Sequence, residues 1–520
     1  MSNSTKLAHS LLRQLIELGI SDFVVSPGSR NAPLLIALGE AAQKQVIDLH
    51  TKIDERGAAF FALGISKASN NYVAVVCTSG TAAANYLPAA LEALHGRSKL
   101  LIITADRPAR LRKTGANQTT NQVNLFQGIS THDFSSDIDI EPLLKSGPVH
   151  LNVQFDEPLV SAEKTDWLAG LRVSPRSYDN QVNGKLESTT GVLVVGHDRA
   201  GYTVSEITEF ADKLGWPVIA EDPLSFPQAV AHTALFLSDP KISEKLAAQN
   251  VVVIGRTTLS RSTNNFIKLA KNLIVIDPRT KDIDSKREGN LILSQLPNEV
   301  VSQKSAGSDW QIASDLTANI ITELDWSEQL AIVNICKSIP TQSSLFIGSS
   351  RPVRDVEAFC KPRSGVQVLA NRGLAGIDGN ISTVFGIATE FESTYAILGD
   401  LTFLHDISAL TNRTDQNVRI YVINNNGGGI FSTLSQAGVD NFESLFGTPH
   451  NLDLVKVCEG FQVKAKSVSN LDQLQAINNE PVKGLEVVIV EVPNREINAK
   501  ILKDLTQRVS SAVRIGINLA

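Results

Sequence analysis

The 520-residue sequence is poor in residues that stabilise domains through disulfides or metals. It has four cysteines, Cys77, Cys336, Cys360 and Cys458, and no C-x-x-C pair, so neither a disulfide framework nor a thiolate zinc site is expected. The nine histidines are dispersed and form no H-E-x-x-H motif, which argues against a histidine metal site. We expect the cysteines to be buried thiols.

The sequence also lacks an excess of positive charge and a long hydrophobic run. Lys and Arg total 48 against 54 Asp and Glu, and no Lys/Arg-rich run marks a nucleic-acid partner. Apolar runs such as 251–254 are far shorter than the roughly 18 residues of a membrane-spanning helix. Residues 7–20 form an amphipathic pattern rather than the apolar core of a signal peptide. We expect a soluble, cytoplasmic protein that binds neither nucleic acid nor membrane.

What the sequence does contain is a repeated alternation of short Val/Ile-rich runs with helix-length segments. This alternation is typical of buried parallel sheets. The predicted strands are 23–25, 73–77, 100–104 and 150–153, then 192–195, 217–220, 251–254 and 273–277, then 345–348, 366–370, 395–399, 419–424 and 485–490.

Two boundaries separate these three groups of strands. A polar stretch over 174–190 has the composition of a linker, and a second boundary falls near residue 325. The sequence therefore predicts an α/β protein with three parallel-sheet domains, at residues 1–175, 188–325 and 326–520. Because ligands bind beyond the carboxyl ends of parallel strands, the loops after these strands are the places to look for chemistry.

Two loops of the third group carry hard oxygen ligands. Asp400 directly follows the strand 395–399, and the strand ending at Asn424 continues as Asn425, Asn426 and three glycines, 427–429. A carboxylate, an amide oxygen and a backbone carbonyl suit Mg²⁺ when phosphate oxygens complete the octahedron. The alternative is that Asp400 caps a helix and the Asn/Gly run is only a turn. The two loops together favour a metal and diphosphate site.

The first group offers a carboxylate and anion-binding turns. Glu55 lies at the start of an apolar helical stretch, which either places it against a hydrophobic interior or on a surface first turn. Residues 26–30 and 78–81 each follow a strand and open a helix, where backbone N–H groups face an anion or merely cap the helix.

Four arginines occupy comparable positions near strand ends: Arg30, Arg107, Arg354 and Arg372. Each alone is compatible with a surface salt bridge. Together, in a net-acidic protein, they indicate a substrate with several carboxylates, because Arg binds carboxylate bidentately.

These features resemble the thiamine-diphosphate enzymes. Their metal motif usually reads G-D-G to N-N, which matches Asp400 and Asn425 here with Leu401 at the third position, and Glu55 matches the glutamate that bonds N1′ of the cofactor. More detailed strings narrow the resemblance to the 2-succinyl-5-enolpyruvyl-6-hydroxy-3-cyclohexene-1-carboxylate synthase family of menaquinone and phylloquinone biosynthesis. These strings are 26–30, HTKIDERG at 50–57, 78–81, 104–108, 115–118, NRGLAGIDG at 371–379 and NNNGGGIF at 424–431.

The resemblance implies pyrimidine-binding, central and diphosphate-binding domains, in that order, and a homo-oligomer with cofactor sites at the dimer interface. It implies thiamine diphosphate with Mg²⁺ or Mn²⁺ as cofactors, and 2-oxoglutarate and isochorismate as substrates. Glu55 would be catalytic. The metal ligands would be Asp400, Asn425 and Gly427. The cofactor would also contact Ser79, Gly80, Ile430, Phe431 and Leu434. The substrates would contact Ser29, Arg30, Arg107, Asn117, Gln118, Arg261, Ser350, Arg354 and Arg372.

Two departures from the family pattern leave questions open. The central-domain segment 259–261 has a single basic residue, Arg261, where the family typically has several. Arg351 stands where the family often has an aliphatic residue, and it faces either the site or solvent.

Three other functions are weighed against this one. Another thiamine-diphosphate enzyme, such as a 2-oxoacid decarboxylase or acetohydroxyacid synthase, shares the cofactor, but the arginine set argues against small neutral acceptors. A non-catalytic binding protein is disfavoured because Glu55, Asp400 and Asn425 are intact. A nicotinamide dehydrogenase is disfavoured because no G-x-G-x-x-G follows a predicted strand.

Overall fold

A computed structural model describes residues 2–144, 147–162, 165–174, 185–187, 189–256, 259–278, 289–304, 307–412 and 414–519. Most of the predicted linker over 174–190, including the domain limits at 175 and 188, lies outside these ranges. The chain divides into two compact units, the first built from residues 1–179, 371–394 and 402–418 and the second from the rest. The three domain ranges stay predictions.

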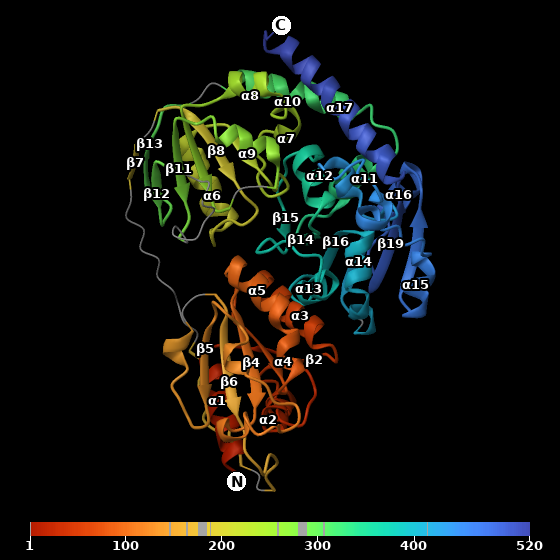
Figure 1. The fold of residues 1–520 in the computed structure, drawn as a ribbon. Coiled ribbons are helices and arrows are strands. Elements are labelled where there is room, and N and C mark those ends of the chain that lie inside the picture. The colour runs from red at the N-terminus through yellow and green to blue at the C-terminus, as the bar shows by residue number, and fades with distance from the viewer. Residues whose placement is uncertain are drawn as a thin grey trace. The chain divides into compact units, whose positions relative to one another are not determined.

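The first unit is built on a six-stranded sheet with the order β2-β1-β3-β4-β6-β5 (Figure 1). All its described pairs are parallel. The strands are β1 (Asp22–Val25), β2 (Asp48–Thr51), β3 (Val73–Cys77), β4 (Leu100–Asp106), β5 (Ser130–Phe134) and β6 (Val149–Gln154). The helices are α1 (Asn3–Glu17), α2 (Ala32–Gln43), α3 (Glu55–Ser69), α4 (Thr81–Asn85), α5 (Leu87–Gly96) and α13 (Asn380–Ile387).

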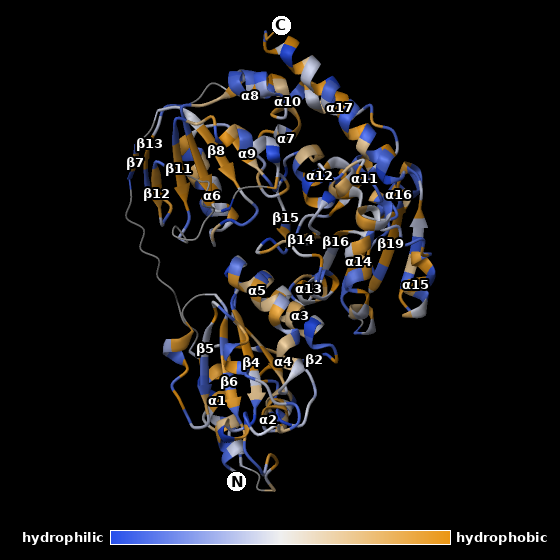
Figure 2. Ribbon diagram, viewed as in Figure 1, coloured by the Kyte–Doolittle hydropathy of each residue, from blue (hydrophilic) through white to orange (hydrophobic). Residues whose placement is uncertain are grey.

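Alternation along the strands divides the side chains of this sheet between two faces. Phe23 and Val25 of β1, on one face, belong to the hydrophobic cluster that α1 and α2 cover. α3 and α5 contact the sheet outside this cluster. The inner strand β4 is fully buried and largely orange in Figure 2, as expected for a parallel strand covered on both faces.

Helix α3 carries the first residue of the predicted site. Asp54 caps it by accepting a hydrogen bond from the backbone N–H of Arg56 (3.0 Å), and so fixes Glu55 as the first helical residue. α3 packs closely on α13, where a Cβ at Gly64 would lie 2.2 Å from the carbonyl oxygen of Thr383. Only glycine permits this approach, which ties 371–394 to the N-terminal sheet.

The second unit contains the central sheet, of order β12-β11-β10-β8-β9, with parallel pairing. Its strands are β8 (Gly191–Val195), β9 (Val218–Ala220), β10 (Asn250–Ile254), β11 (Asn272–Ile276) and β12 (Leu291–Leu293), and β7 (Lys185–Glu187) pairs separately with β13 (Glu299–Val301). The helices are α6 (Val204–Leu214), α7 (Thr233–Phe236), α8 (Pro240–Leu246), α9 (Arg261–Ile267) and α10 (Ser308–Ile321).

A further six-stranded sheet has the order β15-β14-β16-β17-β19-β18. Its strands are β14 (Ser343–Ile347), β15 (Val366–Leu369), β16 (Ser393–Gly399), β17 (Asn417–Asn424), β18 (Lys464–Val468) and β19 (Leu485–Glu491). The helices are α11 (Glu328–Ser338), α12 (Arg351–Phe359), α14 (Asp400–His405), α15 (Leu454–Gly460), α16 (Leu471–Asn478) and α17 (Arg495–Gly516).

Helix α17 links the sheets of the second unit through its apolar stripe. It lies alongside α10 (Figure 1). Leu505, Val509 and Val513 of α17 share a buried cluster with Val192 of β8 and Trp310 of α10. The structure thus confirms an α/β fold built on three large parallel sheets, and it contains every predicted strand. Among the described helices, none is long and apolar enough to span a membrane.

Candidate functional site

The predicted site residues fall into two groups, one in each unit. In the second unit, the predicted metal ligands Asp400, Asn425 and Gly427 follow the neighbouring strands β16 and β17, and we call them the metal-ligand cluster. Asp400 is 2% exposed, and its Oδ2 accepts a hydrogen bond from the backbone N–H of Gly427 (2.7 Å). Its Oδ1 accepts one from the N–H of Leu401 (2.7 Å), and Asp400 is the first residue of helix α14.

Asn425 offers an oxygen to this cluster. Asn425 is 7% exposed, and its Oδ1 accepts no hydrogen bond from the described residues. A buried amide oxygen without a donor is costly unless a ligand meets it. The side-chain nitrogen is occupied, because it donates to Glu328 Oε2 at 3.4 Å.

Gly427, two residues after Asn425, stands where a larger residue would not fit. Gly427 has φ +133°, and a Cβ there would lie 2.1 Å from the carbonyl oxygen of Gly447. Its own carbonyl accepts from the N–H of Gly429 (2.9 Å) and keeps a second lone pair for a cation. A carboxylate, an unsatisfied amide oxygen and this carbonyl fit a hard divalent cation.

A buried charged network supports this cluster, and the sequence did not point to it. Glu328, at the start of α11, is 3% exposed, and burial raises its pKa, with the charge of Asp355 adding to the effect. Asp355 forms an ion pair with Arg351 one helical turn away. His450 Nε2 lies 3.4 Å from Asp400 Oδ2. Arg351 is only 9% exposed, so its side chain does not face solvent.

Among the described residues, no group of three or more His, Cys, Asp or Glu is placed to hold a metal. The metal-ligand cluster does not contradict this, since its donors are one carboxylate, one amide and one backbone carbonyl.

The three predicted apolar cofactor contacts follow the metal-ligand cluster in the chain. Ile430 and Phe431 lie in a 3-10 turn, residues 429–433, and Leu434 ends it by donating its N–H to the carbonyl of Phe431 (3.2 Å). All three are half-buried. The ring of Phe431 packs 5.5 Å from that of Phe446.

Three further predicted substrate residues belong to the second unit. Ser350, with φ +74°, precedes α12, and its carbonyl accepts from the guanidinium of Arg354 (2.5 Å). Arg261 begins α9, is exposed, and lines a surface cavity with Ser238 and Glu244. The structure brings Ser350 and Arg354 together.

In the first unit, the structure brings three predicted residues into one hydrogen-bonded group. Arg107 Nη1 donates to Ser79 Oγ (2.9 Å) and to the carbonyl of Gln118 (2.9 Å). Ser79 Oγ donates to the same carbonyl (2.9 Å), and Gln118 Nε2 donates back to the carbonyl of Ser79 (2.9 Å). Gly80 follows directly at the start of α4. We call this set the Ser79–Arg107 cluster.

Arg30 lies near this cluster. Arg30 Nη1 donates to the carbonyl of Phe155 (3.1 Å) and pairs with Glu157 (3.2 Å). Partial burial, and then the charge of Arg30, lower the pKa of Arg107 below its usual value. An anion beside these two guanidinium groups would relieve their repulsion.

The remaining first-unit residues are more separate. Glu55 is half-buried, and its charge adds to burial in raising the pKa of Cys77 and of Tyr86. Ser29 and Asn117 are exposed. Arg372 is half-buried, and the next two backbone N–H groups donate to the carboxylate of Glu92 (both 2.7 Å), which anchors its segment.

Family models match along the chain in the order of the three sheets. The models described as the N-terminal thiamine pyrophosphate (TPP) binding domain, the middle domain of thiamine pyrophosphate, and the C-terminal TPP binding domain match residues 5–125, 161–347 and 353–492. Together with the metal-ligand cluster, they define the chain as a thiamine pyrophosphate enzyme. A benzoylformate decarboxylase from Polynucleobacter necessarius shares the fold, with a TM-score of 0.69 and 16% identity over 94% of this chain and 99% of that one.

Full-length relatives give a narrower assignment. Proteins of Nocardioides sp., Thermobifida fusca and Lysinibacillus sphaericus are 36%, 33% and 32% identical to the chain, covering 98%, 99% and 98% of it and 97%, 100% and 99% of their own lengths. Each is named 2-succinyl-5-enolpyruvyl-6-hydroxy-3-cyclohexene-1-carboxylate synthase. The chain belongs to this synthase family.

Proposed function

We propose that the chain decarboxylates 2-oxoglutarate and adds the resulting succinyl semialdehyde unit to isochorismate in a 1,4-addition, as a step of menaquinone or phylloquinone biosynthesis. The products are 2-succinyl-5-enolpyruvyl-6-hydroxy-3-cyclohexene-1-carboxylate and CO₂. The observation that carries the proposal is near full-length similarity to relatives of that name.

Bound thiamine diphosphate supplies the carbanion stabilisation that decarboxylation and carbon–carbon bond formation require. Asp400, Asn425 and the Gly427 carbonyl would hold Mg²⁺ or Mn²⁺ against the diphosphate. The unsatisfied Oδ1 of Asn425 supports this role. Ser79 and Gly80 would contact the cofactor, and Ile430, Phe431 and Leu434 would shield it from water.

Glu55 would bind N1′ of the aminopyrimidine and hold a proton there. Its position as the first residue of α3, fixed by the Asp54 cap, supports this role because the backbone presets where its side chain begins. We also propose that the cofactor lies at a dimer interface, so that the enzyme is a homo-oligomer, as the family resemblance implies.

The arginines would bind the carboxylates of the two substrates. Their guanidinium groups remain charged at neutral pH and are poor acids, so they hold anions without protonating a carbanion. Arg30 and Arg107 are near one another, and Arg354 and Arg372 are each half-buried on anchored segments. Ser29, Asn117, Gln118 and Ser350 would add hydrogen bonds, and the exposed Arg261 a further charge.

The test is to mix purified protein with thiamine diphosphate, Mg²⁺, 2-oxoglutarate and isochorismate and to follow loss of the isochorismate diene absorbance. Omission of each component in turn is the control. Consumption that requires all four is the expected result. Release of CO₂ without consumption of isochorismate would instead identify a decarboxylase with another acceptor.

A further inference from the structure

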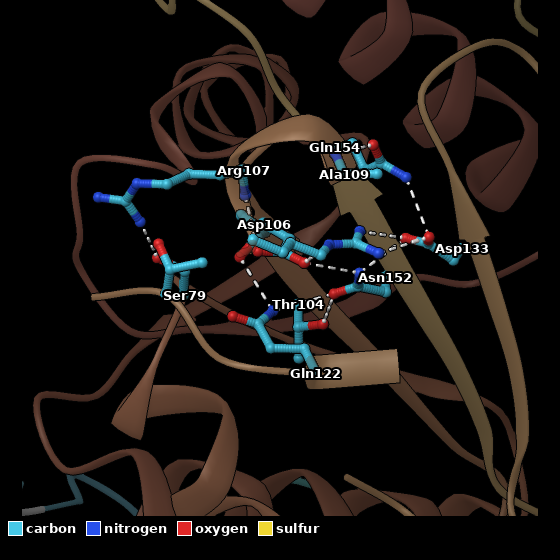
Figure 3. Close-up of polar contacts among 12 residues, drawn as sticks. Ser79, Thr104, Asp106, Arg107, Ala109, Gln122, Asp133, Asn152 and Gln154 are labelled. Carbon is cyan, nitrogen blue, oxygen red and sulfur yellow. Dashed lines mark hydrogen bonds and ion pairs between the residues drawn. The ribbon is translucent and has the colours of Figure 1, made fainter. Parts of the chain in front are cut away.

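A buried polar network lies at the carboxyl end of the first unit's sheet (Figure 3). Thr104 and Asp106 of β4, Asn152 of β6 and Gln122 all have 0% exposure. Such groups are expensive to bury unless every donor and acceptor is satisfied. Their hydrogen bonds therefore indicate what the network holds in place.

The two ends of the Gln122 amide bind different parts of the unit. Its Oε1 accepts the backbone N–H of Gly80 (2.9 Å), so its nitrogen must face the other way. Nε2 donates to Asn152 Oδ1 (2.9 Å) and to the carbonyl of Ala105 (3.3 Å). One side chain thus joins the helix-opening turn at Gly80 to strands β4 and β6.

The Asn152 amide is also bonded at both ends, with its oxygen accepting and its nitrogen donating. Its Oδ1 also accepts from Thr104 Oγ1 (2.8 Å), and its Nδ2 donates to Asp106 (3.0 Å) and Asp133 (2.8 Å). Arg112 pairs with both carboxylates, at 2.9 Å and 2.7 Å. The guanidinium of Arg112 thus lies against both carboxylates of the network.

The network adjoins the Ser79–Arg107 cluster at two points. The backbone N–H of Arg107 donates to Asp106 Oδ1 (2.7 Å), and Gly80, the partner of Gln122, directly follows Ser79. Gln122 itself comes four residues after Gln118 in the chain. The network thus meets the turn at Gly80 through Gln122 and the segment of Arg107 through Asp106. Figure 3 draws the bond from Asn152 to Asp133 within the network and the bond from Arg107 to Ser79 within the cluster.

We propose that Gln122 is a positioning residue, whose amide holds the Ser79–Gly80 turn in register with the segment that carries Arg107 and Gln118. The inference rests on the proposed function, in which these residues contact cofactor and substrate. A displacement of roughly 1 Å at binding groups costs as much as a hundredfold in rate, so loss of the register impairs substrate binding.

The experiment compares Gln122→Met with Gln154→Met. Met is close to Gln in length and removes both amide atoms. Gln154 is the matched control, because its amide also donates to a member of the network, Asp133 (Nε2 to Oδ2, 3.0 Å), but its oxygen accepts the N–H of Ala109 rather than that of Gly80. Two readouts are measured: hydrogen exchange of the Gly80 amide without ligands, and kcat and KM for both substrates.

We expect Gln122→Met to speed Gly80 exchange about tenfold or more, because that N–H loses its acceptor. We expect kcat/KM to fall about ten- to a hundredfold, mainly through KM. Gln154→Met should change neither by more than about threefold. Unchanged exchange and unchanged KM in folded Gln122→Met would overturn the proposal.

Gln122→Glu is the second test of the positioning role, used if the Met variant does not fold. It keeps the acceptor for Gly80 but places a second oxygen against Asn152 Oδ1 and the Ala105 carbonyl, so Gly80 stays protected while KM rises. A normal KM in this variant overturns the proposal. An inactive wild type would refute the proposed function instead, and Gly80 exchange would still test the positioning.

Discussion

The side-chain amide of Asn425 donates a hydrogen bond to Glu328, with Nδ2 and Oε2 3.4 Å apart and both residues buried. This bond decides which end of the amide is free. Because the nitrogen is engaged, the oxygen is the atom left without a donor among the described residues. Glu328 would therefore orient a proposed metal ligand.

We predict that Glu328→Leu weakens Mg²⁺ binding about 10- to 100-fold, the usual effect of losing a residue that orients a metal ligand. Titration calorimetry with Mg²⁺ at saturating thiamine diphosphate measures it. Glu328→Gln is the control, since it keeps an oxygen that accepts from Asn425 and should bind Mg²⁺ within about threefold of wild type. Equal affinity of the Leu variant and wild type would remove Glu328 from this role.

The fold was predictable where strands are buried on both faces. Every Val/Ile-rich run became a strand. The missed strands of the large sheets, β2, β5, β12 and β18, all lie at sheet edges. The sequences of β2, β5 and β18 are mostly polar and partly solvent-accessible, so they lack the apolar run that signals a buried strand. Strand β12 (Leu291–Leu293) is apolar, but it is only three residues long and largely exposed.

The candidate site was predictable only where it forms a local motif. Asp400 and Asn425 are recognisable because each directly follows a strand and the residue types suit a cation. Glu328 precedes Asn425 by 97 positions, and Gln122 and Asn152 are 30 apart. No local pattern marks such residues, because tertiary packing alone brings them together. For the same reason the sequence left Arg351 open, whereas the structure pairs it with Asp355.

We predict that Glu55→Gln lowers kcat about 10²- to 10⁴-fold, the usual scale of proton-transfer catalysis. Gln keeps the size of the side chain but cannot hold the proton at N1′. The synthase assay measures kcat, and calorimetry checks separately that thiamine diphosphate still binds. Glu40→Gln is the matched control, because Glu40 is a carboxylate of the same unit that accepts from Trp167 Nε1 (2.9 Å). Near-normal turnover of Glu55→Gln would exclude Glu55 from the mechanism.

We predict that replacing Arg354 or Arg372 with Met costs on the order of 2 to 5 kcal/mol in transition-state binding, as expected for an arginine that pairs with a buried carboxylate. The cost follows from the ratio of kcat/KM values. Arg110→Met is the control, since Arg110 pairs with Asp156 at the exposed surface and should cost under about 1 kcal/mol. A cost that small at Arg354 or Arg372 would mean that the residue forms only a surface salt bridge.

His150 makes the stability of the first unit depend on pH. The ring is fully buried, with Nε2 2.8 Å from Thr104 Oγ1 and Nδ1 3.1 Å from Thr131 Oγ1. Burial lowers its pKa from 6.5 to about 3, and the nearby charge of His132 acts in the same direction while that of Asp133 opposes it. Between these two values the unfolded chain binds the proton and the folded chain does not. Stability therefore decreases as the pH falls below 6.5.

We predict that lowering the pH from 6.5 to 5 costs the first unit about 2 kcal/mol through this residue, at roughly 1.4 kcal/mol per pH unit. His150→Gln removes the titrating group and keeps a donor for Thr104, so the variant should lose that much less stability over the same interval. Pulse proteolysis in urea, read on fragments from residues 1–144, gives the free energy of unfolding at each pH. Substitution of the exposed His405 by Gln should leave the pH dependence as in wild type. If His150→Gln and wild type lose equal stability, His150 is protonated in the folded protein and its burial does not produce the pH dependence.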